Sequence, residues 1–360
     1  MGPYHPALPQ PLRLTFKLRG ERIVGVETPV AGFCRRGVES LAIGQDDDHA
    51  LKIVERACGW SGHSYRTALA QALEAAAGTP PSPRVQIVRT VFAEVERILA
   101  RLWLLAQVAR AGSLQPLLRD ALEARERFYD ALTETTGERH YWGVAVVGGV
   151  RTLDAPDLQP LSSALEQFGA TVDTWKIVTG PRGALGRLGA DLGHISEQQV
   201  REQRVSSVVA RAAGVADDLR RDTPYGGYAL ASVDWPDDSG VERKGDVAAR
   251  CAVAADDLAT SVRVAGALLR ALPDASDSPG AGTRAAAAPA KSGRARVEAP
   301  HGAVEVTVSA TDSGRIADFR LDTPGAGTLS LLPAVLEGQP VSASALIIAS
   351  LDMCIECLDR

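Results

Sequence analysis

The sequence has no long apolar run, no apparent signal peptide and no excess of basic residues. The best candidate for a membrane-spanning helix, Ile98–Val108, is shorter than the roughly 18 apolar residues required and contains Arg101. The first residues, MGPYHPALPQPLRL, lack a basic segment followed by an apolar one, so no signal peptide is expected. The 39 Lys and Arg residues are outnumbered by 44 Asp and Glu residues, which disfavours a nucleic-acid-binding surface. We therefore expect a cytoplasmic protein that does not bind nucleic acid.

Cysteine is scarce, and its odd count does not indicate a disulfide framework in a chain without a signal peptide. Thiols that stay reduced are available for metal binding or catalysis. The five cysteines are Cys34, Cys58, Cys251, Cys354 and Cys357. The last two are spaced Cys-Ile-Glu-Cys after an apolar run, whereas a thioredoxin-like redox pair would lie between a strand and a helix. We interpret them as metal ligands, the alternative being two small residues in a buried segment.

Hydrophobic periodicity predicts a mostly helical α+β protein with small β elements at its two ends. Alternation of apolar and polar residues around Arg19–Gly20 predicts a β-hairpin within residues 1–30. Apolar residues that recur every three or four positions predict a helical body over residues 31–273. The predicted helical stretches are Asp48–Ala77, Pro83–Ala111, Leu114–Thr135, Glu197–Ala213 and Gly245–Leu272.

Residues 274–296 are rich in Ala, Gly, Pro and Ser, which is typical of a mobile, solvated loop. The following segment, 297–360, contains strand patterns in AVEVTVSA and RIADFRL, then a helix and the cysteine pair. A unit of this size would be marginal alone, so we expect it to dock on the helical body within a single domain, 1–360.

A second group of chemically capable residues lies between two helical patterns, in the segment Glu-Arg-Ala-Cys-Gly-Trp-Ser-Gly-His at 55–63. Cys58 lies far from Cys354 and Cys357 in the sequence, so a shared site can exist only in the folded chain. Three thiolates with a hydroxyl would make a soft site, suited to nickel, copper(I), zinc or an iron–sulfur cluster. His63 is either a further nitrogen ligand or a polar surface or core residue.

Several segments occur in one order along the whole chain, among them AGFCRRGVESLA, ERACGWSGHSY, PRVQIVRTVFAEVERILARL, VEAPHGAVEV and SLDMCIECLDR. In this order the chain resembles the large subunit of membrane-bound, energy-converting nickel–iron hydrogenases. It equally resembles the homologous quinone-site subunit of respiratory complex I. The resemblance implies the helical bundle of a hydrogenase large subunit.

In such hydrogenases two Cys-x-x-Cys pairs hold a nickel–iron centre, so the resemblance implies that Cys58, Cys354 and Cys357 are metal ligands. Ser61 stands at the fourth position, where a hydroxyl is a harder and far less acidic ligand than a thiol. Glu356 lies between the last two cysteines, either as a ligand to a cation or as a solvent-facing side chain.

Three further residues are assigned roles by the resemblance. Glu39 matches the position that passes protons between the metal site and solvent, although it could also be a helix-start carboxylate favoured by the helix dipole. His301 replaces a catalytic-site arginine and lacks its fork of donors and its permanent charge. His5 corresponds to the loop at the quinone head-group pocket, or is simply a flexible terminal residue.

Other residues that match the family pattern are expected to have structural roles. Four of them imply an internal ion-pair brace, namely Asp218, Arg220, Pro224 and Tyr225. Cys34 and Cys251 match no ligand position, and we expect both to be small core residues.

The resemblance implies an oxidoreductase component that links electron transfer to proton movement. Electrons would arrive from an iron–sulfur small subunit, whose cluster is in that partner and not in this chain. Further expected partners are a protein like the C-type component of complex I and antiporter-like membrane proteins, which would hold the chain on the inner face of the cell membrane. The alternatives are a non-catalytic coupling or scaffold subunit without metal, and a quinone-reducing subunit.

Overall fold

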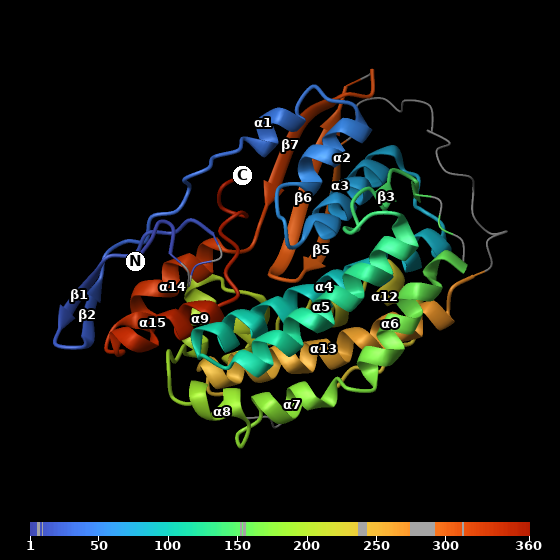
Figure 1. Ribbon diagram of the computed structural model, residues 1–360. Helices are drawn as coiled ribbons and strands as arrows, with labels where there is room; N and C mark the ends of the chain where they lie inside the picture. The colour runs from blue at the N-terminus through green and yellow to red at the C-terminus, as the bar shows by residue number, and fades with distance from the viewer. Residues whose placement is uncertain are drawn as a thin grey trace.

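The computed structural model describes the chain apart from residues 6–7, 9, 152, 154–155, 237–242, 274–291 and 312. It is an α+β protein in which helices form the body and short antiparallel sheets lie at its periphery (Figure 1). The described helices are α1 (Val38–Ala42), α2 (Asp47–Glu55), α3 (Gly62–Ala77), α4 (Pro83–Ala111), α5 (Gln115–Thr136), η1 (Pro156–Leu158), α6 (Gln159–Gly169), α7 (Asp173–Thr179), α8 (Ala184–Gly189), α9 (Glu197–Gln203), α10 (Ser207–Ala212), α11 (Leu219–Asp222), α12 (Gly227–Leu230), α13 (Val247–Arg270), α14 (Ala326–Leu336), η3 (Val341–Ala343) and α15 (Ser344–Ser350). The described strands are β1 (Phe16–Arg19), β2 (Arg22–Val26), β3 (Ala145–Val146), β4 (Gly149–Val150), β5 (Ser292–Ala299), β6 (Gly302–Ala310) and β7 (Ile316–Asp322).

Helix α4 is the centre of the body. It begins after Ser82, whose hydroxyl accepts the Val85 N–H at 3.4 Å, and Pro83 occupies a first-turn position where its missing N–H costs nothing. Apolar and charged side chains alike are buried on most of its faces, because α5, α13 and α15 all pack against it. In Figure 1 α4, α5 and α13 run side by side through the molecule.

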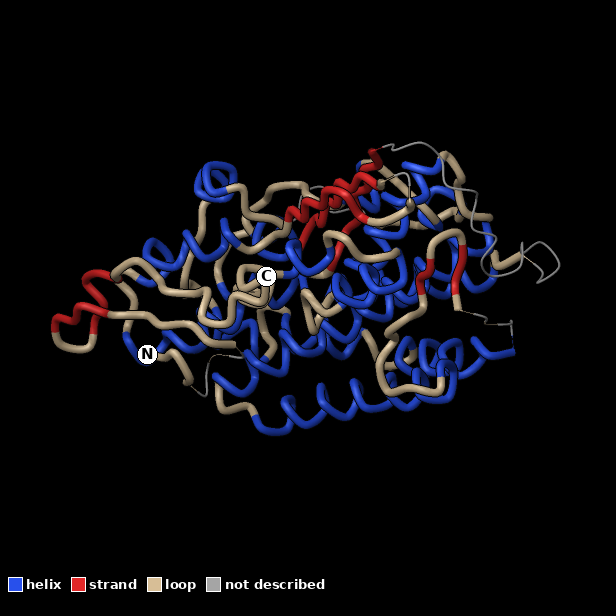
Figure 2. The backbone as a smooth tube through the Cα atoms, turned by 90° about the horizontal axis from the view of Figure 1, so that it is seen from above, coloured by secondary structure: helices blue, strands red, loops and turns tan. Residues whose placement is uncertain are grey.

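The predicted N-terminal hairpin is confirmed as β1 and β2, which pair antiparallel around Arg19 and Arg22. Figures 1 and 2 show that it projects from one end of the body. Its base is fixed because the Ile23 N–H donates to the Gln339 carbonyl at 2.9 Å, and Ile23 itself is buried.

The C-terminal sheet has the order β5-β6-β7, and α3 covers one face of it. The two predicted strands are confirmed as β6 and β7, but residues 292–296, predicted to be loop, belong to β5. They pair with β6 throughout, and Arg294 donates to Glu305 across the strands at 2.7 Å. Gly293 permits this packing, since a Cβ there would lie 1.9 Å from the Ala72 carbonyl oxygen of α3. The rest of the predicted loop, 274–291, lies outside the described residues.

Two predicted helical stretches are each divided in the structure. Asp48–Ala77 becomes α2 and α3, with the Cys58 segment between them. Glu197–Ala213 becomes α9 and α10, because Arg204 adopts a left-handed backbone conformation with φ 53° and ends the first helix. None of the described helices combines the length and the hydropathy that crossing a membrane requires.

Candidate metal centre

Three cysteine sulfurs meet in the interior. Cys58 lies in the loop between α2 and α3, whereas Cys354 and Cys357 follow α15. The three Sγ atoms all lie within 4.8 Å of one another, and those of Cys58 and Cys354 are 3.4 Å apart although the residues are 296 positions apart. All three side chains are buried. The expected convergence is therefore present, while the ligand role of the three cysteines remains a prediction.

The loop that carries Cys58 is fixed where α3 begins. Gly62 is required there, because a Cβ at this position would lie 2.6 Å from the Glu55 carbonyl oxygen. The buried carboxylate of Glu96, from α4, accepts the N–H groups of His63 at 2.8 Å and Ser64 at 3.2 Å. Glu96 thus accepts backbone N–H groups in the first turn of α3 that have no partner within their own helix. Burial raises the pKa of Glu96 to about 8.

Ser61 and His301, which stand where the resemblance places a cysteine and an arginine, contact each other. The Ser61 hydroxyl lies 3.1 Å from Nδ1 of His301, and Nε2 of the same ring lies 3.6 Å from Oδ1 of Asp352. Arg101 donates to Asp352 and to the carbonyl of Pro300, which precedes His301. The imidazole is therefore held between a hydroxyl and a carboxylate at the edge of the thiol cluster.

The three thiols differ in their acidity. Burial alone raises the pKa of Cys58, but hydrogen bonds from Cys354 and Cys357 outweigh it and hold that pKa well below its ordinary value. Burial raises the pKa of Cys354 well above its ordinary value, and the neighbouring sulfurs add to the rise. The hydrogen bond with Cys354 lowers the pKa of Cys357, but the hydrogen bond with Cys58 and burial outweigh it, so this pKa also lies well above its ordinary value. Tyr65 donates its hydroxyl to Cys357 Sγ at 2.9 Å, which opposes the rise. A cation bound here would displace the remaining thiol protons.

This donor set fits one soft cation. Thiolates select nickel, zinc or copper(I) over hard ions, and no carboxylate belongs to the group formed by the described cysteines. The two-metal centre implied by the resemblance requires four thiolates. The described residues provide three, and the Ser61 hydroxyl at the fourth position is engaged with His301. The chain therefore does not fit that centre as it stands.

The other predicted site residues lie around the cluster. The Glu356 carboxylate accepts the Gly59 N–H at 2.6 Å, so it braces the two cysteine segments against each other. Glu39, in the first turn of α1, accepts Nε–H of Arg360 at 2.7 Å. Of the two roles considered for His63, metal ligand or polar core residue, the structure supports the second. Its Nε2 forms a hydrogen bond with the Arg89 carbonyl at 2.8 Å, and burial lowers its pKa to about 4.

A cavity of about 40 Å³ adjoins His301 and Asp352. One wall is formed by the stacked indoles of Trp60 and Trp103, whose centroids are 4.9 Å apart. The N-terminal segment contributes Gln10 to the lining, whereas His5 is not among the described residues that line it. The cavity is small and lies beside the thiol cluster.

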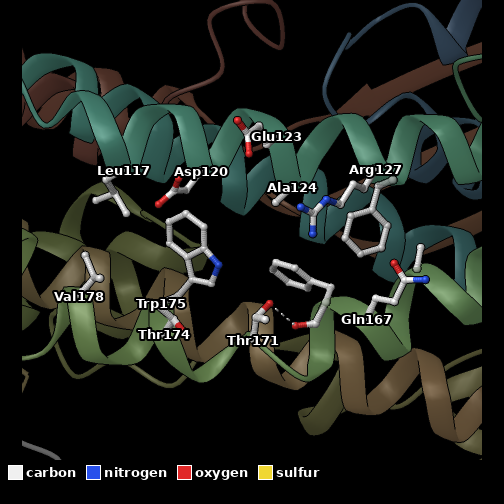
Figure 3. A pocket seen from close by; sticks show the side chains of 13 residues that line it. Leu117, Asp120, Glu123, Ala124, Arg127, Gln167, Thr171, Thr174, Trp175 and Val178 are labelled. Carbon is white, nitrogen blue, oxygen red and sulfur yellow. Dashed lines mark hydrogen bonds between the residues drawn. The ribbon is translucent and has the colours of Figure 1, made fainter.

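A larger cavity, of about 260 Å³, lies elsewhere, between α5 and helices α6 and α7. Figure 3 shows Trp175 pointing across it toward α5, with Asp120 and Arg127 on the opposite side. None of the cysteines or their contacts lines this cavity, so we do not assign it to the site.

The predicted ion-pair brace is present. Arg220, buried in α11, donates to Asp218 at 2.6 Å and to Glu94 at 3.1 Å. The prediction for Cys251 is confirmed, since it is buried and its pKa is raised to about 12 by burial. The prediction for Cys34 is wrong, because the segment before α1 runs along the surface and leaves this cysteine exposed.

A family profile, "Respiratory-chain NADH dehydrogenase, 49 Kd subunit", matches residues 112–284 and 280–360. The chain belongs to this family. The resemblance noted from the sequence is thereby confirmed, and family members are large subunits of complex I-like and membrane-bound hydrogenase-type complexes.

The relatives span both branches of the family. The chain is 26% identical to the carbon monoxide-induced hydrogenase of Rhodospirillum rubrum, with 100% of this chain and 98% of the relative covered. It is 27% identical to the D-type subunit of NADH-quinone oxidoreductase from Geobacillus kaustophilus, with 100% and 97% covered. A solved structure of the membrane-bound sulfane sulfur reductase, an archaeal respiratory membrane complex, shares the fold with a TM-score of 0.88 and 24% identity, covering 100% of this chain and 97% of that one.

The sequence did not identify several residues that contact the site, namely Tyr65, Glu96, Arg101 and Asp352. Tyr65 follows Cys58 by seven positions and Asp352 precedes Cys354 by two, so proximity in sequence was a usable signal for both. Glu96 and Arg101 are on α4, and nothing local in the sequence distinguishes them from a charged helix face.

Proposed function

We propose that this chain is the substrate-side redox subunit of a membrane-associated, multi-subunit oxidoreductase, with a single soft metal ion bound by Cys58, Cys354 and Cys357. The observation that carries the proposal is the convergence of three buried sulfurs from distant segments within 4.8 Å. Buried thiols that serve only to fill a core have no reason to gather at one point, whereas thiolate ligands to a soft ion must do so.

In this proposal the bound ion supplies electron exchange, and the chain's own residues hold and surround it. With the ion bound, the Tyr65 hydroxyl would donate to the thiolate of Cys357. His301, held between Ser61 and Asp352, would place a hydrogen-bonding imidazole beside the bound ion. Glu39, paired with Arg360 near the surface, would exchange protons with solvent.

The names of the relatives support the proposal that this chain has partner subunits, because those names place the relatives in multi-subunit enzymes such as membrane-bound hydrogenase and NADH-quinone oxidoreductase. We propose that the electrons arrive from an iron–sulfur subunit, and that a protein like the C-type component of complex I and antiporter-like proteins complete the assembly. Through them the chain would be peripheral on the inner face of the membrane.

A second candidate function uses the thiols without metal. The Sγ atoms of Cys58 and Cys354 are 3.4 Å apart, so a small movement would join them in a disulfide. Two thiols could then reduce a persulfide, R–S–SH, to R–SH and H₂S while becoming a disulfide, which electrons from a partner would reduce again. The name of the structural neighbour, a sulfane sulfur reductase, is consistent with this chemistry.

Metal analysis of the complex purified from its native membrane separates these functions. The first predicts one redox-active ion per chain, nickel or copper, lost on Cys58→Ser and retained on Cys251→Ser, a matched control at a buried thiol outside the cluster. Zinc has no redox chemistry, so a zinc ion in its place would contradict the proposed electron exchange. Absence of metal together with persulfide reduction would favour the dithiol, and absence of both would leave a scaffold subunit. Nickel and iron with infrared bands of iron-bound carbonyl and cyanide would restore the two-metal centre.

A further inference from the structure

The side chain of Arg36 touches both segments that carry the clustered cysteines. It lies in the loop before α1, and its terminal nitrogens donate to the carbonyls of Arg56 at 2.7 Å, Ala57 at 2.6 Å and Glu356 at 2.7 Å. Its Nε donates to the carbonyl of Asp359 at 3.3 Å. Every acceptor in this set is a backbone carbonyl, so the guanidinium contacts main-chain positions and is not part of a carboxylate ion pair.

Two of these carbonyls are adjacent to clustered cysteines. Ala57 immediately precedes Cys58, and Glu356 immediately precedes Cys357. A single nitrogen of Arg36 donates to both carbonyls, so one planar, rigid group fixes the separation between the two cysteine segments. An ammonium on a flexible stem would not reproduce this, because it lacks the fork of donors.

We propose that Arg36 is a positioning residue for the thiol cluster, which sets the distance between Cys58 and the pair Cys354 and Cys357. The inference rests on the proposed function, because it names the residue that aligns the ligands of that site. The bond from the Gly59 N–H to the Glu356 side chain, at 2.6 Å, spans the same two segments. Loss of Arg36 therefore loosens the cluster without abolishing it.

Arg84 provides a matched control. It is also an arginine that joins distant segments through backbone carbonyls, donating to Pro273 at 2.8 Å and to Leu153 at 3.0 Å. Neither acceptor adjoins a cysteine. Arg84→Met thus removes a comparable clamp from the fold and leaves the thiol cluster unaltered.

The experiment measures two properties of Arg36→Met, Arg36→Lys and Arg84→Met in the purified complex. The first is the affinity for added Ni²⁺. We expect a loss of about 10- to 100-fold for Arg36→Met, a smaller loss for Arg36→Lys and no change for Arg84→Met. The second is the rate at which mild oxidation joins Cys58 to Cys354 in a Cys357→Ser background, followed by mass spectrometry of the linked peptides. Arg36→Met should slow it several-fold.

The two measurements separate the proposals. If the unaltered complex binds no metal but Arg36→Met slows the cross-link relative to Arg84→Met, the positioning role stands and the metal centre fails. Equal affinities and equal cross-linking rates for Arg36→Met and Arg84→Met would overturn the positioning role. Equal losses in melting temperature for these two variants would show that differences at the cluster do not arise from general destabilisation.

Discussion

Replacement of Arg101 by methionine removes a completely buried guanidinium from the middle of α4. This group donates to Asp257 at 2.8 Å, to the Ser207 hydroxyl at 2.9 Å, and also to Asp352 and the Pro300 carbonyl. Because it supports the residues on both sides of His301, the substitution tests whether the site depends on this buried network.

The expected loss in the free energy of unfolding depends on which hydrogen bonds the partners of Arg101 retain. Asp257 keeps two hydrogen bonds from Arg211, at 2.6 and 2.7 Å, whereas Asp352 keeps, within the described part of the chain, only His301 at 3.6 Å. Breaking one side of a buried ion pair costs about 3–5 kcal/mol, because the remaining charge has no compensation. At roughly 2 °C per kcal/mol, the melting temperature should fall by about 6–10 °C.

Arg139→Met is the control, because Arg139 pairs with Glu126 at 2.6 Å while both side chains are about half exposed to solvent. Exposed pairs contribute at most about 1 kcal/mol, so its melting temperature should shift by no more than roughly 2 °C. Differential scanning fluorimetry of the purified complexes measures both variants. Equal shifts for the two substitutions would refute the reasoning that the buried network stabilises the site.

Three further outcomes are expected. Ser61→Cys supplies the fourth sulfur and frees His301, so the affinity for added Ni²⁺ should rise. An unchanged affinity would count against a lost nickel–iron ligand. Tyr65→Phe removes the hydroxyl that donates to Cys357, so the sulfur-to-metal charge-transfer band should shift, while the free energy of unfolding should change by only about 1 kcal/mol. A band that does not move would show that Tyr65 does not donate to a metal-bound sulfur. Burial raises the pKa of Glu96 from 4.5 to about 8, so folding favours the protonated form of this side chain. The free energy of unfolding should therefore decrease as the pH rises from about 4.5 to 8. Glu96→Gln should flatten this decrease in denaturant titrations at several pH values, and an identical profile would show that Glu96 does not titrate there.

The sequence predicted the elements whose signals are local. The long helices α4 and α13 follow from apolar periodicity, and the N-terminal hairpin follows from alternation around a turn. Strand β5 was missed because its first residues share the small, polar composition of the preceding segment. They become a strand only through pairing with β6 and the close approach of α3 that Gly293 allows.

The residues of the site likewise divide into those with a local signal in the sequence and those without one. The cysteines were recognisable from their spacing and from the family resemblance, whereas the residues that hold them were not. Arg36 and Arg101 act through backbone carbonyls and buried carboxylates that are distant in sequence, and such contacts leave no local pattern. The prediction that Cys34 is buried was wrong for a related reason. Cysteine is usually a buried residue type, but the path of the loop that carries Cys34 exposes it.

X-ray absorption at the metal edge of the purified complex tests the central claim most directly. We predict a first shell that contains three sulfur scatterers at about 2.3 Å, unchanged in Cys251→Ser, whereas the metal-edge signal is lost in Cys58→Ser. A metal surrounded only by oxygen and nitrogen, or a shell that is unchanged in Cys58→Ser, would contradict the account.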